Sequence, residues 1–159
     1  MPRAGYIRKR TLPPDPLYQS PLVSRLVNRL MKSGKKSIAQ KQIYQTLDLL
    51  KNKAGKDPLT VLNEAIENIK PLMEVRSRRI GGAAYQIPMP ISADRREALA
   101  IRWLITAAAA RPNKEFHHFS AKLAAEILSA LEKQGAAIKK RQDMERMAEA
   151  NKAFAHFRW

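Results

Sequence analysis

Apolar residues recur every three or four positions along most of the chain from residue 20 to residue 150. This spacing predicts amphipathic helices, because positions three and four apart share one face of a helix. Glycine, proline and capping residues interrupt the repeats and mark the expected helix ends. We therefore predict six helices, over residues 20–34, 37–53, 57–70, 92–111, 116–133 and 136–150.

Several of these helices carry more specific signals. Ser20-Pro21 and Asp57-Pro58 each place a capping side chain before a proline at the first helical position. The stretch Ala98–Ala110 is apolar nearly all round, which favours a central place in the core. In the second helix the positions at core-like spacing are Ile38, Ile43, Leu47 and Leu50.

Between the third and fourth helices the period changes from helical to two. Tyr85, Ile87, Met89 and Ile91 alternate with other residues, and Gly81-Gly82 suits a tight turn. We predict a β-hairpin over residues 73–91. Pro88 and Pro90 lack amide donors on the same edge, so that edge is expected to be unpaired.

The predicted fold class is therefore mainly α, a six-helix body with one protruding two-stranded hairpin. Residues 1–19, with four basic side chains followed by Pro13, Pro14 and Pro16, are expected to form an extended basic arm that orders on binding. Residues 20–150 form the helical domain, and residues 151–159 a short C-terminal tail.

Charge narrows the choice of partner. The 159 residues include 30 Lys and Arg against 14 Asp and Glu, a formal net charge of +16. Residues 1–41 are strongly basic, whereas residues 42–73 and 97–138 are nearly neutral. Basic groups at distant places in the sequence suggest one charged face assembled by folding, and nucleic acid is the leading partner.

Other classes of protein are disfavoured. The chain has no cysteine, which excludes disulfides, thiolate catalysis and cysteine-based zinc sites. No apolar run approaches the roughly 18 residues of a membrane span, so we expect a soluble, unexported protein. We predict no cofactor and no metal.

The hairpin is the most informative feature, because its first strand carries Arg76, Arg78 and Arg79. Two-stranded ribbons are marginal in water and cannot bury both faces. We interpret the arginines as phosphate ligands. The alternative is a solvated hairpin that covers core with Tyr85, Ile87 and Met89.

No catalytic site is predicted. Gly34-Lys35-Lys36-Ser37 resembles the end of a phosphate-binding loop, but the upstream glycine position holds Arg29 and the hydroxyl position holds Lys36. His117 and His118 lack an identifiable supporting acid, so we interpret them as helix-surface residues. We therefore predict that the chain is not an enzyme.

Two long runs, at the hairpin and at the C-terminus, carry a family resemblance. They are residues 74–88, EVRSRRIGGAAYQIP, and residues 146–159, RMAEANKAFAHFRW. The chain resembles the bacterial-type small-subunit ribosomal protein seven family over its whole length. Shorter runs agree, namely residues 34–37, 99–103 and 137–141. The stretch from residue 111 to 131 fits less closely.

The resemblance implies a primary rRNA-binding protein that binds the 3′ major domain and nucleates assembly of the subunit head. It also implies a position at the subunit interface near the exit-site tRNA and the mRNA path, beside ribosomal proteins nine and eleven. The residues expected at rRNA are Arg3, Arg8, Lys9, Arg10, Arg25, Arg29, Lys32, Lys35, Lys36, Arg76, Arg78, Arg79, Arg95, Arg96 and Arg102. Those expected near tRNA or mRNA are Gly81, Gly82, Tyr85, Lys139, Lys140, Arg141, Arg146, Lys152, His156, Arg158 and Trp159.

Two other functions stay open on the residues alone. The same charge would serve a free nucleic-acid-binding regulator, including one that represses its own message. A hydrolase using His117 or His118 is the remaining class. The expected location is the ribosome in the cytoplasm, or in the plastid stroma for an organellar protein, with no membrane association and no homo-oligomer.

Overall fold

A computed structural model describes residues 11–158 and resolves them into two compact units, which divide after Ile43. The first unit contains helix α1 (Pro21–Leu30) and the start of helix α2 (Lys36–Ala54). The second contains the rest of α2, helices α3 (Pro58–Ile69), α4 (Ala93–Ala110), α5 (Phe119–Leu131) and α6 (Ala136–Ala150), and a 3-10 helix η1 (Lys152–Phe157). Strands β1 (Met73–Ile80) and β2 (Ala83–Pro90) lie between α3 and α4. The predicted order of six helices and one hairpin is confirmed.

In the first unit, residues 13–19 fold back onto α1. Residues 11–20 contain no helix or strand, as predicted, but the part from residue 13 to 19 is tied down. Ser24 Oγ donates to the Pro13 carbonyl at 2.9 Å, and the buried Asp15 carboxylate accepts from the backbone amides of Leu17 and Tyr18, both at 3.2 Å. In α1 the predicted apolar stripe buries Val23, Leu26 and Val27.

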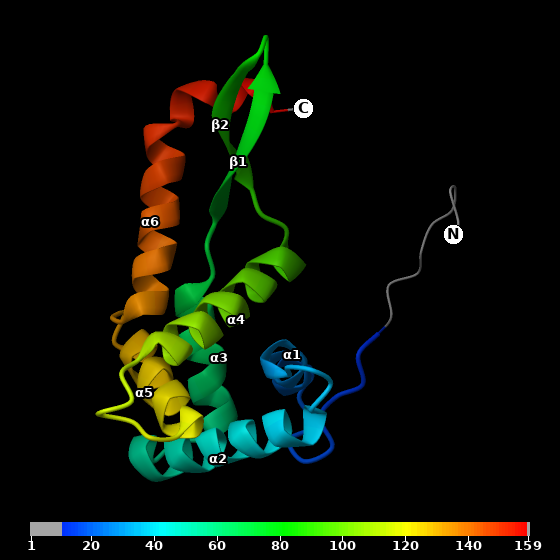
Figure 1. Ribbon diagram of the computed structural model, residues 1–159, viewed down its shortest axis with the longest axis vertical. Coiled ribbons are helices and arrows are strands. Elements are labelled where there is room, and N and C mark those ends of the chain that lie inside the picture. Colours follow the sequence, from blue (N-terminus) through cyan, green and yellow to red (C-terminus); the bar gives the residue numbers. More distant parts are fainter. Residues whose placement is uncertain (1–10, 159) are drawn as a thin grey trace. The chain divides into compact units, whose positions relative to one another are not determined.

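The second unit is a helical base with a hairpin rising from it beside α6 (Figure 1). Helices α3, α4, α5 and α6 all pack against one another. Leu104 of α4 is fully buried, so the prediction that this helix is central is confirmed, although Arg102 and Thr106 leave one face of it exposed. The other large, fully buried side chains of this core include Leu62, Ile66, Leu123, Ile127 and Ile138.

The hairpin pairs Met73 with Pro90 at its base and Ile80 with Ala83 at its tip. Gly81 and Gly82 form the turn at φ values of 56° and 90°, the left-handed conformations that a two-residue hairpin loop requires. Within the described residues the sheet has these two strands alone, in agreement with the proline-blocked edge.

Three local expectations were wrong. Helix α1 ends at Leu30 rather than near Gly34, because the backbone leaves the helical region at Met31, which has a ψ of 128°. Ile38 is 57% exposed, so the core-facing side of α2 excludes it. Helix α5 begins at Phe119, which leaves His117 exposed in the preceding loop. Within the predicted C-terminal tail, residues 152–157 form η1.

Capping accounts for some helix starts and not others. Asp57 accepts a hydrogen bond from the Thr60 amide at 3.1 Å, as its position predicts. Ser20 occupies the corresponding position before α1, but its side chain makes no capping hydrogen bond. The proline that follows it at the first helical position is in place.

Candidate nucleic-acid interface

The base of the hairpin holds two arginines on one buried carboxylate. Arg76 of β1 donates from Nε to Glu74 Oε1 at 2.5 Å, and Arg95 of α4 donates from Nε to Glu74 Oε2 at 2.7 Å. The Glu74 side chain is 6% exposed, whereas each arginine side chain is 48% exposed. The carboxylate therefore orients two guanidinium groups from distant segments and leaves part of each open to solvent.

The charge of Glu74 depends on these arginines. Burial by itself would raise the pKa of the Glu74 carboxyl, because it disfavours the charged form. The hydrogen bonds and positive charges of Arg95 and Arg76 outweigh burial and hold the pKa below its usual value. One ionised carboxylate, Glu74, therefore pairs with two guanidinium groups, Arg76 and Arg95. The three side chains together carry one net positive charge, which can attract a polyanion.

We expect Glu74→Gln to destabilise the protein more at neutral pH than at acid pH. The folded state lowers the pKa of Glu74, so the ionised carboxylate contributes its full stability above the unfolded pKa and loses it as pH falls through the folded pKa. Urea denaturation at pH 7 and pH 3 measures the difference in free energy of unfolding. Glu64→Gln, on the exposed face of α3, is the matched control. A wild-type advantage that stayed constant with pH would contradict the assignment.

The upper part of the hairpin presents the other two arginines. Arg79 is exposed and Arg78 is half-buried opposite Tyr85. Within residues 11–158 neither side chain has a hydrogen bond or ion pair. Both guanidinium groups therefore keep their full capacity to donate to an external acceptor.

The other arginines predicted on this side differ in their surroundings. Arg96 is half-buried and donates from Nε to the Ile91 carbonyl at 3.0 Å, which fixes the start of α4 beneath the hairpin. Arg102 lies on the exposed face of the same helix. The structure thus collects Arg76, Arg95 and Arg96 around the hairpin base from two segments separated by the hairpin turn.

The C-terminal segment packs against the hairpin. The ring of Tyr85 on β2 lies 5.3 Å from that of Phe154 and 5.8 Å from that of Phe157, both centroid to centroid. The His156 ring lies 3.9 Å from that of Phe157, with the two ring planes tilted by 42°. Figure 1 shows η1 beside the upper half of the hairpin, where α6 ends. These ring contacts therefore join η1 to the β2 strand of the hairpin.

Basic residues along α6 and η1 are mostly open to solvent. Lys139, Lys140 and Lys152 are exposed, and Arg146 is 80% exposed with a loose ion pair to Asp143 at 3.9 Å. Exposed Arg158 donates to the Ala155 carbonyl at 3.1 Å, and exposed His156 contacts the Ala153 carbonyl through Nδ1 at 2.9 Å.

Arg141 is different, because its side chain is directed into the fold. It donates from Nη1 to the Asn68 carbonyl at 2.6 Å and is 25% exposed. Its Nε lies 3.7 Å from Glu145 Oε2. This side chain links α6 to the end of α3, a structural contact that its position in a basic run does not indicate.

The first unit carries a separate basic surface. Arg29, Lys32, Lys35 and Lys36 are exposed around the turn that joins α1 to α2, and Arg25 is half-buried on α1. Hydrogen bonds from Lys35 N to the Lys32 carbonyl and from Lys36 N to the Gly34 carbonyl, at 3.0 and 2.8 Å, shape this turn. Arg3, Arg8, Lys9, Arg10 and Trp159 lie outside the described residues.

Sequence reasoning missed Glu74, the residue that organises the hairpin base. Residues two positions apart on a strand lie on the same face, so the spacing of Glu74 and Arg76 could have predicted their ion pair. The contact of Glu74 with Arg95 could not be predicted, because the two residues lie far apart in the sequence and meet only in the folded structure. Across residues 11–158 no group of three histidine or acidic side chains could hold a metal ion, and no helix is long and apolar enough to cross a membrane.

Guanidinium and ammonium groups are exposed around the hairpin and along the C-terminal helix. This surface is typical of a basic, helical protein that binds a polyanion. Comparison with known protein families identifies the family of the chain. The model of the family Ribosomal protein S7p/S5e matches residues 2–152. The chain belongs to this family, and it is a ribosomal protein of the small subunit.

Curated relatives agree over the full length. The small ribosomal subunit protein uS7 of Thermodesulfovibrio yellowstonii is 54% identical, that of Caldicellulosiruptor saccharolyticus 52%, and that of Clostridium tetani 50%. Each alignment covers 100% of both chains. The relatives are bacterial ribosomal proteins of a structural, non-enzymatic family, so the resemblance and the prediction that the chain is not an enzyme are both confirmed.

Proposed function

We propose that this protein binds the 3′ major domain of small-subunit rRNA directly and nucleates assembly of the subunit head. The observation that carries the proposal is the group of arginines on the hairpin. Glu74 orients Arg76 and Arg95, and Arg78 and Arg79 have no partner within the described residues. Oriented guanidinium groups donate in pairs to phosphate oxygens, which suits a folded RNA backbone.

In this proposal the parts of the chain divide the binding. The arm of residues 1–19 and the exposed basic groups around the turn between α1 and α2 bind rRNA, together with the hairpin base. The hairpin tip, α6 and η1 lie near the exit-site tRNA and the mRNA path, beside ribosomal proteins nine and eleven. The packing of Tyr85 on Phe154 and Phe157 supports this division, because it makes the hairpin and the C-terminus one continuous element.

We expect affinity for a 3′ major domain rRNA fragment to fall steeply as salt concentration rises. Each phosphate contact releases condensed counterions and adds about 0.7 to 0.9 to the slope of log affinity against log salt. A filter-binding titration over several salt concentrations measures the slope, with an unrelated structured RNA of equal length as the control. A flat response, or equal affinity for the unrelated RNA, would contradict the proposal.

A second role, as a regulator that binds its own message, uses the same charged surfaces. Sedimentation separates the two. A ribosomal constituent migrates with small subunits at physiological salt, whereas a protein that acts only as a free regulator stays at the top of the gradient. The proposal requires the first result.

A further inference from the structure

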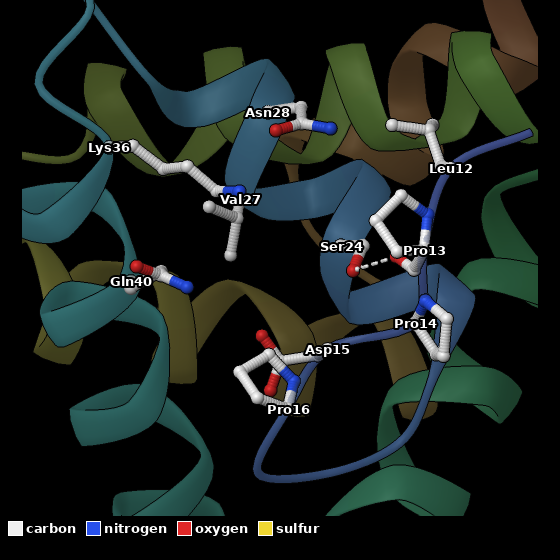
Figure 2. A pocket seen from close by; sticks show the side chains of 10 residues that line it. All are labelled: Leu12, Pro13, Pro14, Asp15, Pro16, Ser24, Val27, Asn28, Lys36 and Gln40. Carbon is white, nitrogen blue, oxygen red and sulfur yellow. Dashed lines mark hydrogen bonds between the residues drawn. The ribbon is translucent and has the colours of Figure 1, made fainter. Parts of the chain in front are cut away.

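The first unit contains a cavity that the charged surfaces do not explain. It has a volume of about 310 Å³ and lies between residues 12–16, α1 and the first turns of α2. Figure 2 shows prolines on one side and the polar ends of Lys36 and Gln40 directed toward the space from α2. Its lining residues are Leu12, Pro13, Pro14, Asp15, Pro16, Ser24, Val27, Asn28, Lys36 and Gln40.

Hydrogen bonds hold the wall of the cavity in place. The Asp15 carboxylate caps its own turn through the amides of Leu17 and Tyr18, and the Gln19 amide donates to the Asp15 carbonyl at 2.8 Å. Ser24 holds the Pro13 carbonyl at 2.9 Å. These bonds fix the proline wall against α1, so the cavity has a defined shape before any ligand arrives.

Three polar side chains in the wall have unused hydrogen-bonding capacity. The side chains of Asn28, Lys36 and Gln40 make no hydrogen bond or ion pair within residues 11–158. Asn28 and Gln40 are half-buried and come from different helices. Each amide offers a donor and an acceptor side by side, the pattern that matches the edge of a nucleobase.

The charge of the cavity argues against a phosphate. Lys36 supplies one positive charge and Asp15 one negative charge, so the wall is close to neutral. Leu12, Val27 and the prolines offer an apolar surface to the flat face of a ring. The volume is at the lower end of the roughly 300 to 1,000 Å³ of small-molecule pockets, enough for one heterocycle and too little for a strand.

We propose that this cavity takes one unstacked nucleobase of the bound rRNA, with Asn28 and Gln40 on its edge and the prolines, Leu12 and Val27 against its faces. The proposal rests on rRNA binding and adds the means of sequence-specific recognition. RNA is read chiefly at unpaired bases that leave the stack, since side chains cannot read the deep groove of its helices. Exposed Arg29 and Lys35 in the same unit are available for the flanking phosphates.

The test is chemical footprinting of the 3′ major domain rRNA with dimethyl sulfate, kethoxal and carbodiimide, which together probe the pairing edges of all four bases. The full-length wild type is expected to protect one unpaired base that Asn28→Ala/Gln40→Ala leaves reactive. The double variant should bind about tenfold or more weakly with an unchanged salt slope, because it loses base contacts and no phosphate contact. Gln45→Ala, an exposed amide on the same helix, is the control and should change neither measurement.

The outcomes separate this inference from the function on which it rests. If the wild type binds the rRNA and the double variant gives the same footprint with the same affinity, the cavity holds no base and this inference is wrong. If the wild type itself fails to bind the rRNA, the proposed function is wrong and the cavity proposal is lost with it. Loss of secondary structure in the double variant, measured by circular dichroism, would show that both amides are structural and would likewise overturn the proposal.

Discussion

Replacing Arg78 and Arg79 together with Ala is expected to lower affinity for the 3′ major domain rRNA by well over tenfold and to leave the melting temperature nearly unchanged. Neither side chain has a partner to lose within the described residues. A charge-assisted hydrogen bond contributes about 1.5 to 3 kcal/mol, and about 1.4 kcal/mol corresponds to a factor of ten in affinity. Arg79 is exposed and Arg78 only half-buried, and substitutions outside the core that break no hydrogen bond or ion pair usually change stability by no more than about 0.5 kcal/mol.

The control for this experiment is Lys51→Ala/Lys114→Ala. It removes the same net charge from exposed positions of the second unit that lie outside the proposed interface. Filter binding and thermal unfolding are measured on both double variants. If the two lost affinity equally, net charge alone would drive binding and the assignment of the hairpin would be wrong.

Arg76 is expected to behave differently from its two neighbours. Because it shares Glu74 with Arg95, Arg76→Ala removes a contact to RNA and also half of the compensation for a buried carboxylate. Loss of binding and loss of stability should therefore appear together in that variant. Only the structure separates the three arginines, which look equivalent in the sequence.

The parts that could be predicted from the sequence are those set by local spacing. The helices and the hairpin follow from periodicity over ten to twenty residues, and the Gly81-Gly82 turn follows from its need for positive φ. Contacts between residues far apart in the sequence produce no periodic pattern, so they could not be predicted. The 3-10 helix of residues 152–157 depends on Tyr85, about seventy positions earlier, and the inward turn of Arg141 depends on the Asn68 carbonyl.

The cavity of the first unit illustrates the same limit. Prolines 13, 14 and 16 correctly predicted a segment without helix or strand. Their effect on the fold is tertiary, because it depends on the buried Asp15 and on Ser24 of α1. Composition could predict a basic arm but could not predict that part of it forms a wall opposite Asn28 and Gln40.

The junction of α4, α5 and α6 depends on a buried glutamate. Glu126 is 1% exposed. Its Oε2 accepts a hydrogen bond from Arg111 Nε at 2.7 Å and forms an ion pair with Arg111 Nη2, also at 2.7 Å. Its Oε1 accepts from the Ala137 amide at 3.0 Å, in the first turn of α6, where a negative charge is favoured by the helix dipole. Buried Lys122 donates to the Arg111 carbonyl and to Asn113 Oδ1. The Glu126 carboxylate on α5 therefore links the C-terminal end of α4 to the first turn of α6.

Gly135, the residue before α6, makes room for this carboxylate. Its φ of 97° is one that residues with a Cβ rarely adopt, and an added Cβ would lie 2.9 Å from Glu126 Oε1 and 3.2 Å from Ser129 Cβ. We expect Gly135→Ala to cost about 1 to 3 kcal/mol of stability, because it combines backbone strain with displacement of the carboxylate.

The largest loss of stability is expected from Glu126→Ala, about 3 to 5 kcal/mol, because it leaves the largely buried Arg111 without its counter-charge. For a chain of this length that corresponds to a fall in melting temperature on the order of 10 °C. Glu126→Gln should lie between the wild type and the alanine variant, since its amide oxygen can still accept from Arg111 or from the Ala137 amide. Urea denaturation gives the order, with exposed Glu132→Gln as the control. Glu126→Ala as stable as the wild type would show that hydrophobic packing alone holds the three helices together. Because these residues lie apart from the hairpin arginines, the folded fraction of each variant should bind rRNA with wild-type affinity.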